Sequence, residues 1–431
     1  MNRGLWLAIT LCFSLLSSTV IAGPTALVSA KSTRNQSNGA SSEAAISGNG
    51  QFVAFRSLAT NLVPARCNNG FSHIFVHNRT GGTLTCVSVN SNDNQGNQDS
   101  RAPSISSDGQ VIAFDSAATD LAGGTCNNGF NQIFVRDRTA GTTRCVSVNS
   151  NGSQGNQDSH ASSISSDGQI IAFDSAATNL AGGTCNNGFN HIFVHNRTTG
   201  ATRCVSVHSN GTEGNGDSFD PSISFDGQMI AFHSSATNLN ARCTNGNSHV
   251  YVHDLTNGQT RCVSVDSGEN QGNANSDLPK ISGDGGFVAF ESDSTNLTSE
   301  CTNGFAQIFV RNLTTGRTFC VSVDNHGNQG NNDSDQASIS SDGRMVAFSS
   351  VATNLTTTGC NTGSNQVFVR DRTNTKTTCA SVGPRRVAGN GDSVSPSISS
   401  NGDLVAFEST SNNLVRRDTN GILDIFTHVL P

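Results

Sequence analysis

The chain has 431 residues and a formal net charge of −7; 13% of the residues are charged and 34% are hydrophobic. Its 44 glycines, together with abundant Ser, Thr and Asn, favour short strands joined by tight turns over helices. No run of like charges occurs, so neither a nucleic-acid partner nor a basic membrane-binding patch is expected.

The N-terminus is predicted to be a signal peptide covering residues 1–22. A basic start precedes the apolar stretch "LWLAITLCFSLL", which is too short to span a bilayer, and small residues at Val20–Ala22 suit a cleavage site. We therefore expect a mature chain of residues 23–431 that forms a single domain without a membrane span. Its expected location is secreted or periplasmic, where disulfides persist.

A repeated phrase organises the rest of the chain. "SISSDGQVIAF" at Ser104 returns, with small changes, in seven units whose anchoring isoleucines are 58 or 59 residues apart. These isoleucines are Ile46, Ile105, Ile164, Ile223, Ile281, Ile339 and Ile398.

Each unit carries four strand-like pieces. "PSIS" and "VIAF" flank an Asp-Gly or Asn-Gly turn, and "QIFVRD" and "TRCVSV" form a second hairpin after a loop. Four antiparallel strands repeated seven times predict an all-β fold, a seven-bladed β-propeller. The seventh unit lacks its fourth strand, and "TALVSA" at residues 25–30 aligns with that strand. We predict that this N-terminal strand completes the last blade and closes the ring.

Twelve cysteines of the mature chain form six pairs, and the members of each pair are 19 residues apart. In the seventh unit, Asp418 and Leu27 stand at the two cysteine positions, so pairing between units would leave two unpaired thiols and pairing within units leaves none. We predict six disulfides within blades, and the absence of a CxxC spacing argues against zinc. The pairs are Cys67 and Cys86, Cys126 and Cys145, Cys185 and Cys204, Cys243 and Cys262, Cys301 and Cys320, and Cys360 and Cys379.

The unit "SISSDG…IAF…TNL…IFVRDRTTG…T" resembles the TolB-like, WD40-like propeller repeat called PD40, over essentially the whole mature chain. The resemblance implies a propeller that serves as an interaction platform or as a gating domain of another enzyme. Related repeats carry a "DTNGxxD" phrase before the third strand, which only the last unit keeps. Its Asp418, Asn420 and Asp424 offer oxygen ligands to calcium, and the alternative is an Asx turn that stabilises the loop. No other cofactor is expected.

One position varies among the repeats and is the candidate binding face. It follows "AF" on the second strand, and Ser349 occupies it in the sixth unit. The variety and acidic character of this row suit ligand recognition, with ordinary solvated surface as the alternative. The candidate residues are Arg56, Asp115, Asp174, His233, Glu291 and Glu408.

A second row holds His or Arg in every unit, just after the core of the third strand. One hypothesis is a seven-membered cationic ring that reads an anionic partner. The alternative is that each side chain bonds to a neighbouring turn carboxylate, such as Asp108 or Asp167. The row consists of His77, Arg136, His195, His253, Arg311, Arg370 and His428.

The sequence contains no GxSxG, HExxH or P-loop motif, so no catalytic residue is assigned. We expect an exported, non-enzymatic binding or scaffold propeller, monomeric, whose partner is a protein or a glycan. The alternatives are a carbohydrate-active enzyme with its site at the central channel, and a calcium-dependent surface protein.

Overall fold

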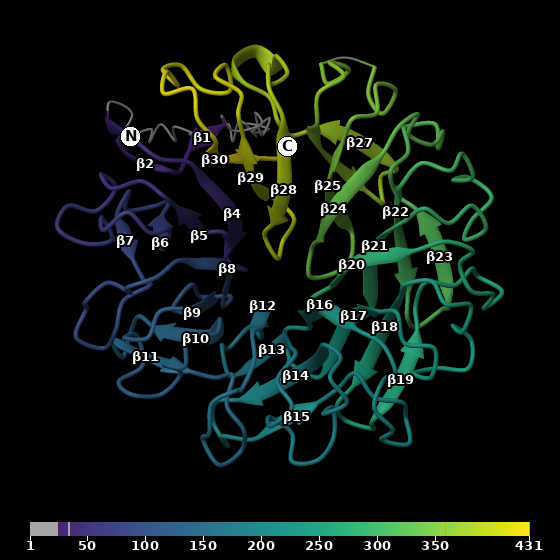
Figure 1. Ribbon diagram of the computed structural model, residues 1–431. Coiled ribbons are helices and arrows are strands. Elements are labelled where there is room, and N and C mark those ends of the chain that lie inside the picture. The colour runs from purple at the N-terminus through teal and green to yellow at the C-terminus, as the bar shows by residue number, and fades with distance from the viewer. Residues whose placement is uncertain (1–24, 33–34, 358, 431) are drawn as a thin grey trace, which may run out of the picture.

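The computed structural model describes residues 25–32, 35–357 and 359–430, and it places seven four-stranded antiparallel sheets in a ring around a central opening (Figure 1). The predicted seven-bladed β-propeller is therefore confirmed. The predicted signal peptide lies outside the described residues. The described part of the chain contains no helix with the length and hydropathy needed to cross a membrane.

Each blade runs from an innermost strand at the ring axis to an outermost strand at the rim (Figure 1). The innermost strands are β4 (Ser41–Ile46), β8 (Ser100–Ile105), β12 (Ser159–Ile164), β16 (Ser218–Ile223), β20 (Ser276–Ile281), β24 (Ser334–Ile339) and β28 (Ser393–Ile398). The second strands are β5 (Phe52–Ser57), β9 (Val111–Ser116), β13 (Ile170–Ser175), β17 (Met229–Ser234), β21 (Phe287–Ser292), β25 (Met345–Ser350) and β29 (Leu404–Ser409).

The third strands are β6 (His73–Asn78), β10 (Gln132–Asp137), β14 (His191–Asn196), β18 (His249–Asp254), β22 (Gln307–Asn312), β26 (Gln366–Asp371) and β30 (Asp424–Val429). The outermost strands are β7 (Leu84–Cys86), β11 (Thr142–Cys145), β15 (Thr202–Cys204), β19 (Gln259–Cys262), β23 (Arg317–Cys320), β27 (Lys376–Cys379) and, in blade 7, β1 (Ala26–Leu27).

The core lies between neighbouring blades, on the second and third strands. In every blade a Phe of the second strand stacks on an aromatic side chain of the third, as Phe55 does on Phe75 with ring centroids 5.9 Å apart. The residue beside that Phe is a fully buried Ala, such as Ala54, which packs in the core cluster shared with the next blade. The repeated "AF" thus supplies one large and one small residue for opposite faces of the sheet.

The first hairpin turn of each blade explains the repeated Ser-x-Asp-Gly. In blade 2, Ser106 Oγ donates to Asp108 Oδ1 at 2.6 Å, and the Gln110 amide donates to the same oxygen at 2.9 Å. Gly109 has φ of 74°, and a Cβ on it would lie 2.2 Å from a ring carbon of Phe52 in blade 1. Glycine is required here both by the turn and by the contact with the preceding blade.

The N-terminal strand closes the ring, as predicted. β1 pairs with β30 in antiparallel register, Leu27 opposite Phe426, and Figure 1 shows these two strands side by side in this blade. Ser29 Oγ donates to Asp424 Oδ1 at 2.6 Å and adds a buried side-chain link to the closure. A short hairpin of β2 (Ala30–Ser32) and β3 (Asn35–Gln36) follows, which the sequence analysis did not predict.

All six disulfides lie within blades, between the predicted partners. Each joins the loop before the third strand to the end of the outermost strand. In blade 7, the equivalent positions are Asp418 in the loop and Leu27 on β1. In each of the six blades formed by one continuous segment, a disulfide therefore links the loop to the outermost strand.

Candidate functional site

The residues of the candidate binding face form a ring at one mouth of the central channel. Each is the fifth residue of a second strand and lies opposite the second residue of the innermost strand, where that strand begins. The cross-strand pairs are Ser42 with Arg56, Arg101 with Asp115, His160 with Asp174, Phe219 with His233, Asp277 with Glu291, and Val394 with Glu408.

The channel itself is a cavity of about 430 Å³ to which all seven innermost strands contribute. Most of its lining side chains are small or cyclic, such as Ala44, Pro103, Ala161 and Pro221, with Lys280 as the one basic residue among them. The channel lining therefore carries few charged side chains, and most of the charged residues of the candidate binding face lie where the innermost strands begin.

Each innermost strand carries a β-bulge, and the third residue of the strand has a left-handed backbone conformation. These residues are Glu43, Ala102, Ala161, Asp220, Leu278, Gln336 and Ser395. A bulge interrupts the ladder, so its backbone amide needs another acceptor.

Side chains of the preceding blade supply that acceptor at four blade junctions. The hydrogen bonds run from the Ala102 amide to Glu43 Oε2 (2.6 Å), from the Glu43 amide to Glu408 Oε2 (3.3 Å), from the Gln336 amide to Glu291 Oε2 (3.4 Å), and from the Ser395 amide to Gln336 Oε1 (2.9 Å). The side chains at this end of the channel thus connect neighbouring blades.

Burial changes the protonation of the mouth carboxyl groups. Asp115 and Asp174 are 1% and 3% exposed. Burial, reinforced by the nearby carboxylate of Asp220, raises the pKa of Asp174 to about 7, and burial also raises the pKa of Glu291 to about 7. The pKa values of Asp115 and Glu408 are raised by burial as well. Near neutral pH, Asp174 and Glu291 therefore exchange between carboxylate and carboxylic acid.

Cations neutralise only part of this ring. Arg56 contacts Glu43 at 3.1 Å, and Asp115 is contacted by Arg101 at 3.3 Å and by His160 at 3.4 Å. The hydrogen bond to Asp115 raises the pKa of His160.

His233 lies between two carboxylates, 3.6 Å from Asp220 and 3.8 Å from Asp277. Among the described residues, no cationic side chain lies within ion-pair distance of Asp174 or Glu291. Each accepts a backbone amide of the next blade, Asp174 from Asp220 and Glu291 from Gln336, and their remaining hydrogen-bonding capacity is what they could offer to a ligand.

The second predicted row does not form a cationic ring. Burial lowers the pKa of His195, His253 and His428 to about 4, and it lowers the pKa of His77 too, so these imidazoles are neutral. Only the three arginines of the row carry charge.

The turn carboxylates predicted as partners of this row are engaged in their own turns instead. Arg136 donates from Nη1 to the Asn90 carbonyl at 2.9 Å and from Nη2 to Asp93 Oδ1 at 2.7 Å. Asn90 and Asp93 belong to the loop that connects blades 1 and 2. The arginines of the row therefore join their third strands to the loop that enters the blade, whereas His195 and His253 bond to a threonine of the outermost strand of their own blade.

The candidate calcium ligands are held by hydrogen bonds to one another and to the N-terminal segment. Asp424 Oδ1 accepts from Ser29 and Ser37, and Oδ2 accepts from Asn420 Nδ2 at 2.8 Å. Asn420 thus turns its amide nitrogen, not its oxygen, toward Asp424. Burial and the neighbouring Asp424 raise the pKa of Asp418 to about 6. This geometry suits the Asx-turn interpretation, and calcium binding stays a prediction.

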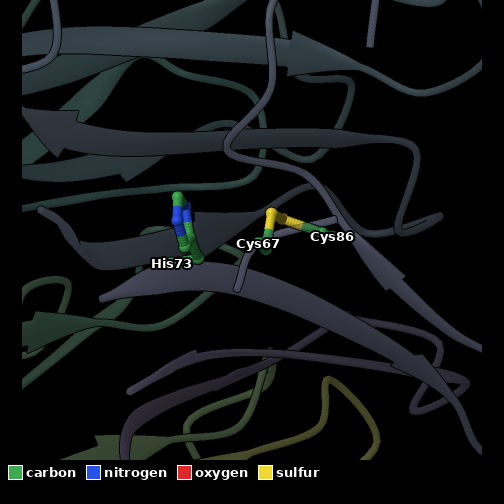
Figure 2. A group of neighbouring side chains, drawn as sticks. All are labelled: Cys67, His73 and Cys86. Carbon is green, nitrogen blue, oxygen red and sulfur yellow. A yellow bond between two sulfur atoms is a disulfide. The ribbon is translucent and has the colours of Figure 1, made fainter. Parts of the chain in front are cut away.

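A cluster of Cys67, His73 and Cys86 has the composition of a zinc site, and Figure 2 shows the imidazole beside the two sulfurs. The sulfurs form a disulfide, which offers no thiolate to a metal. His73 bonds through Nδ1 to Ser88 Oγ at 2.9 Å and through Nε2 to Asn69 Oδ1 at 2.8 Å. Burial lowers its pKa to about 4. The histidine is therefore a neutral bridge between the loop and the segment after the outermost strand.

Comparison with known proteins places this geometry among β-propellers. The chain is similar to the β-propeller domain of the Trilobed protease from Pyrococcus furiosus, with a TM-score of 0.53 and 10% identity over 90% of this chain and 95% of that one. It is similar to oligogalacturonate lyase from Vibrio parahaemolyticus, with a TM-score of 0.51 and 13% identity over 90% and 88%. TolB from Acinetobacter baumannii matches with a TM-score of 0.42 and 16% identity over 91% and 78%.

The two matches with TM-scores above 0.5 confirm the predicted propeller fold. At such identities they carry no information on activity. No family model and no curated protein matches the sequence.

Proposed function

We propose that this chain is an exported, non-enzymatic binding propeller whose partner, a protein, docks at the acidic mouth of the central channel. The observation that carries the proposal is the pair Asp174 and Glu291. Asp174 is buried and Glu291 partly buried, both have a pKa of about 7, and neither has a cation within ion-pair distance among the described residues. Each accepts a backbone amide of the next blade but has no counter-ion, and a cationic ligand that pairs with the ionised carboxylates offsets part of the cost of burying them.

The chemistry of the mouth indicates the chemistry of the partner. Carboxyl groups outnumber arginines there, so a segment with Lys or Arg side chains is favoured electrostatically. The small side chains inside the channel leave room for an extended backbone. A glycan, whose hydroxyl groups donate to carboxylates, is the other ligand that this mouth suits.

The compartment is part of the same proposal. Six disulfides fit a secreted or periplasmic protein, since cytosolic thiols are kept reduced. The functional form is then a monomer of residues 23–431 that keeps its mouth open to a partner.

Affinity capture with residues 23–431, followed by mass spectrometry, tests the proposal. The wild type and the variant D174N/E291Q are compared, with D120N as a control that removes one exposed carboxylate outside the mouth. Asp120 is exposed, and Asn179 and Asn238 occupy the same position in two other blades. We expect a protein that the wild type and D120N recover and that the mouth variant does not. Recovery of the same proteins by all three baits would exclude the mouth as the binding site.

A carbohydrate-active enzyme is the second candidate, and one observation favours it. A carboxyl group whose pKa is raised to about 7 can donate a proton near neutral pH, as general acids of glycan cleavage do. Incubation of the wild type and D174N with an array of polysaccharides separates the two functions. Release of reducing ends by the wild type alone would establish the enzyme, and no release by either leaves the binding proposal standing.

A further inference from the structure

At four blade junctions, the residue type at one position of the connecting loop goes with the residue type, Arg or His, in the basic row of the third strand that follows. At the junction of blades 1 and 2, the loop residue Asp93 has φ of 63° and pairs with Arg136 at 2.7 Å. At the junction of blades 4 and 5, Glu269 has φ of 70° and pairs with Arg311 in the same way. Both arginines are nearly buried. Each buried arginine is thus matched by a carboxylate from the loop.

At the junctions of blades 2 and 3 and of blades 3 and 4, the third strand carries histidine instead and the loop carries glycine. Gly152 precedes His195 and Gly211 precedes His253, and both glycines have the same left-handed backbone. Burial lowers the pKa of both histidines to about 4, so a neutral imidazole needs no counter-ion. Four junctions therefore follow one rule, in which arginine goes with a carboxylate and histidine with glycine.

The junction of blades 5 and 6 breaks this rule. Arg370 stands in the basic row and is 8% exposed, but the matching loop residue is Gly327, with φ of 85°. Arg370 Nη1 donates to the Asp324 carbonyl at 3.0 Å and to Thr377 Oγ1 at 3.1 Å. Among the described residues, no carboxylate lies within ion-pair distance of its guanidinium, and Nη2 has no hydrogen-bond partner. In blades 2 and 5, the Nη2 atom of the equivalent arginine donates to the carboxylate of the loop residue.

Two of the carboxylates near this cavity, Asp324 and Asp266, are engaged in their own loops. Asp324 accepts from the amides of His326 and Asn328 at 2.8 and 2.9 Å and from Asn328 Nδ2 at 2.9 Å. Asp266 is held by Gly268 and Asn270 of its own loop in the same manner. Neither acid is free to turn toward Arg370.

Arg370 and Gly327 line a cavity of about 610 Å³ at the rim of blade 5. A Cβ on Gly327 would meet no atom within 4 Å, so the space that a carboxylate fills at other junctions is open. Hydroxyl groups of Ser267, Thr298 and Ser299 also line the cavity.

The ring of Phe319 supplies the cavity with an apolar face, and the Arg317 guanidinium lies 5.0 Å from the centre of that ring. Glu300 is the exposed acid at the edge. The lining thus combines one unpaired buried cation, hydroxyl groups and an aromatic ring.

We propose that this cavity binds a small hydroxylated carboxylic acid whose carboxylate takes the place of the missing side-chain carboxylate opposite Arg370. Arginine and carboxylate form strong, charge-assisted hydrogen bonds, and partial burial strengthens them. The lining hydroxyls accept and donate to the hydroxyls of the ligand, and Phe319 covers its apolar face. The site is independent of the channel mouth and of the function proposed for it.

Isothermal titration calorimetry of residues 23–431 with D-glucuronate tests the proposal, with D-glucose and inorganic phosphate as comparison ligands. We expect saturable binding of glucuronate, at least tenfold weaker binding of glucose, which lacks the carboxylate, and weaker binding of phosphate, which lacks the sugar hydroxyls. Equal affinity for phosphate would mean a general anion site and would overturn the assignment to a carboxylic acid. Absence of saturable glucuronate binding would overturn the site itself.

Two pairs of variants make the test specific. G327D supplies the internal carboxylate, and Asp93 shows that aspartate accepts this backbone; we expect G327D to abolish binding and to raise the melting temperature. G327N is its neutral match and should keep binding. R370Q should lose binding at least tenfold, whereas R311Q, at the junction that has its own carboxylate, should keep it. Undiminished binding by G327D and R370Q would overturn the proposal.

Discussion

The carboxylate of Glu43 in blade 1 accepts a hydrogen bond of 2.6 Å from the backbone amide of Ala102 in blade 2. Ala102 lies at the bulge of its innermost strand, with φ of 48°, so its amide has no ladder partner in its own sheet. The same oxygen-to-amide contact recurs at other junctions with a different side chain each time. The side chains at this end of the channel therefore connect neighbouring blades.

Glu43→Ala removes the acceptor from the Ala102 amide and from Arg56, which contacts the carboxylate at 3.1 Å. We expect a loss of about 1–3 kcal/mol of unfolding free energy, because a buried donor is left unpaired. Glu43→Gln is the control, since Gln336 accepts the Ser395 amide through its amide oxygen in another blade. Urea unfolding followed by fluorescence or circular dichroism measures both variants, and equal losses in the two would contradict this role.

Replacing both cysteines of one blade, as in C126S/C145S, is expected to cost about 3 kcal/mol, because the disulfide closes a loop of about 20 residues in the unfolded chain. Chemical denaturation of the oxidised proteins gives the difference. Blade 7 holds its rim strand without a disulfide, so the variant should fold. Mass mapping of non-reduced peptides checks the pairing, and any linkage between blades would show that the assignment is wrong.

The loop of Asp418, Asn420 and Asp424 gives a prediction about metal removal. Both carboxylate oxygens of Asp424 are occupied by hydrogen bonds, and Asn420 presents its nitrogen. We therefore expect EDTA and millimolar calcium to leave the melting temperature unchanged. D424A should destabilise the protein, because it leaves Ser29 and Ser37 without their acceptor. A rise in melting temperature on adding calcium, lost in D418N, would establish the metal site instead.

The repeat made most of the fold predictable from the sequence. Strand pairing within a blade depends on local alternation and on turns such as that at Gly109, which every unit repeats. The closure by Leu27 followed from a missing strand at one end and an extra one at the other. The disulfides followed from the paired absence of both cysteines in the seventh unit.

The contacts between blades were not predictable in the same way. Glu43 and Gln336 have left-handed backbones without the glycine or asparagine that would signal them. The partners of the basic row were predicted among the turn carboxylates, whereas Arg136 bonds to a loop more than 40 residues earlier in the chain. One signal was present: at four junctions Arg goes with Asp or Glu and His goes with Gly, whereas Arg370 follows Gly327 and His428 follows Arg386.

Asp174 gives the pH dependence of stability. Its pKa is about 7 in the folded protein against 3.8 ordinarily, so between about pH 4 and pH 7 the native state binds more protons than the unfolded state. The free energy of unfolding should therefore fall as pH rises through this window. The interval corresponds to about 4 kcal/mol, at about 1.4 kcal/mol per pKa unit.

D174N removes the ionisation and keeps an oxygen that can accept the Asp220 amide. We expect D174N to match the wild type near pH 4, to be more stable at pH 8 by up to about 4 kcal/mol, and to lose the part of the downward slope that Asp174 contributes, while Glu291 and Asp418 keep contributing theirs. D120N, which removes an exposed carboxylate, should keep the slope of the wild type. Melting temperatures measured at steps from pH 4 to pH 8 decide the matter. If D174N and the wild type lose stability in parallel across this range, Asp174 is ionised throughout, and the mouth has no carboxyl group poised near neutral pH at this position.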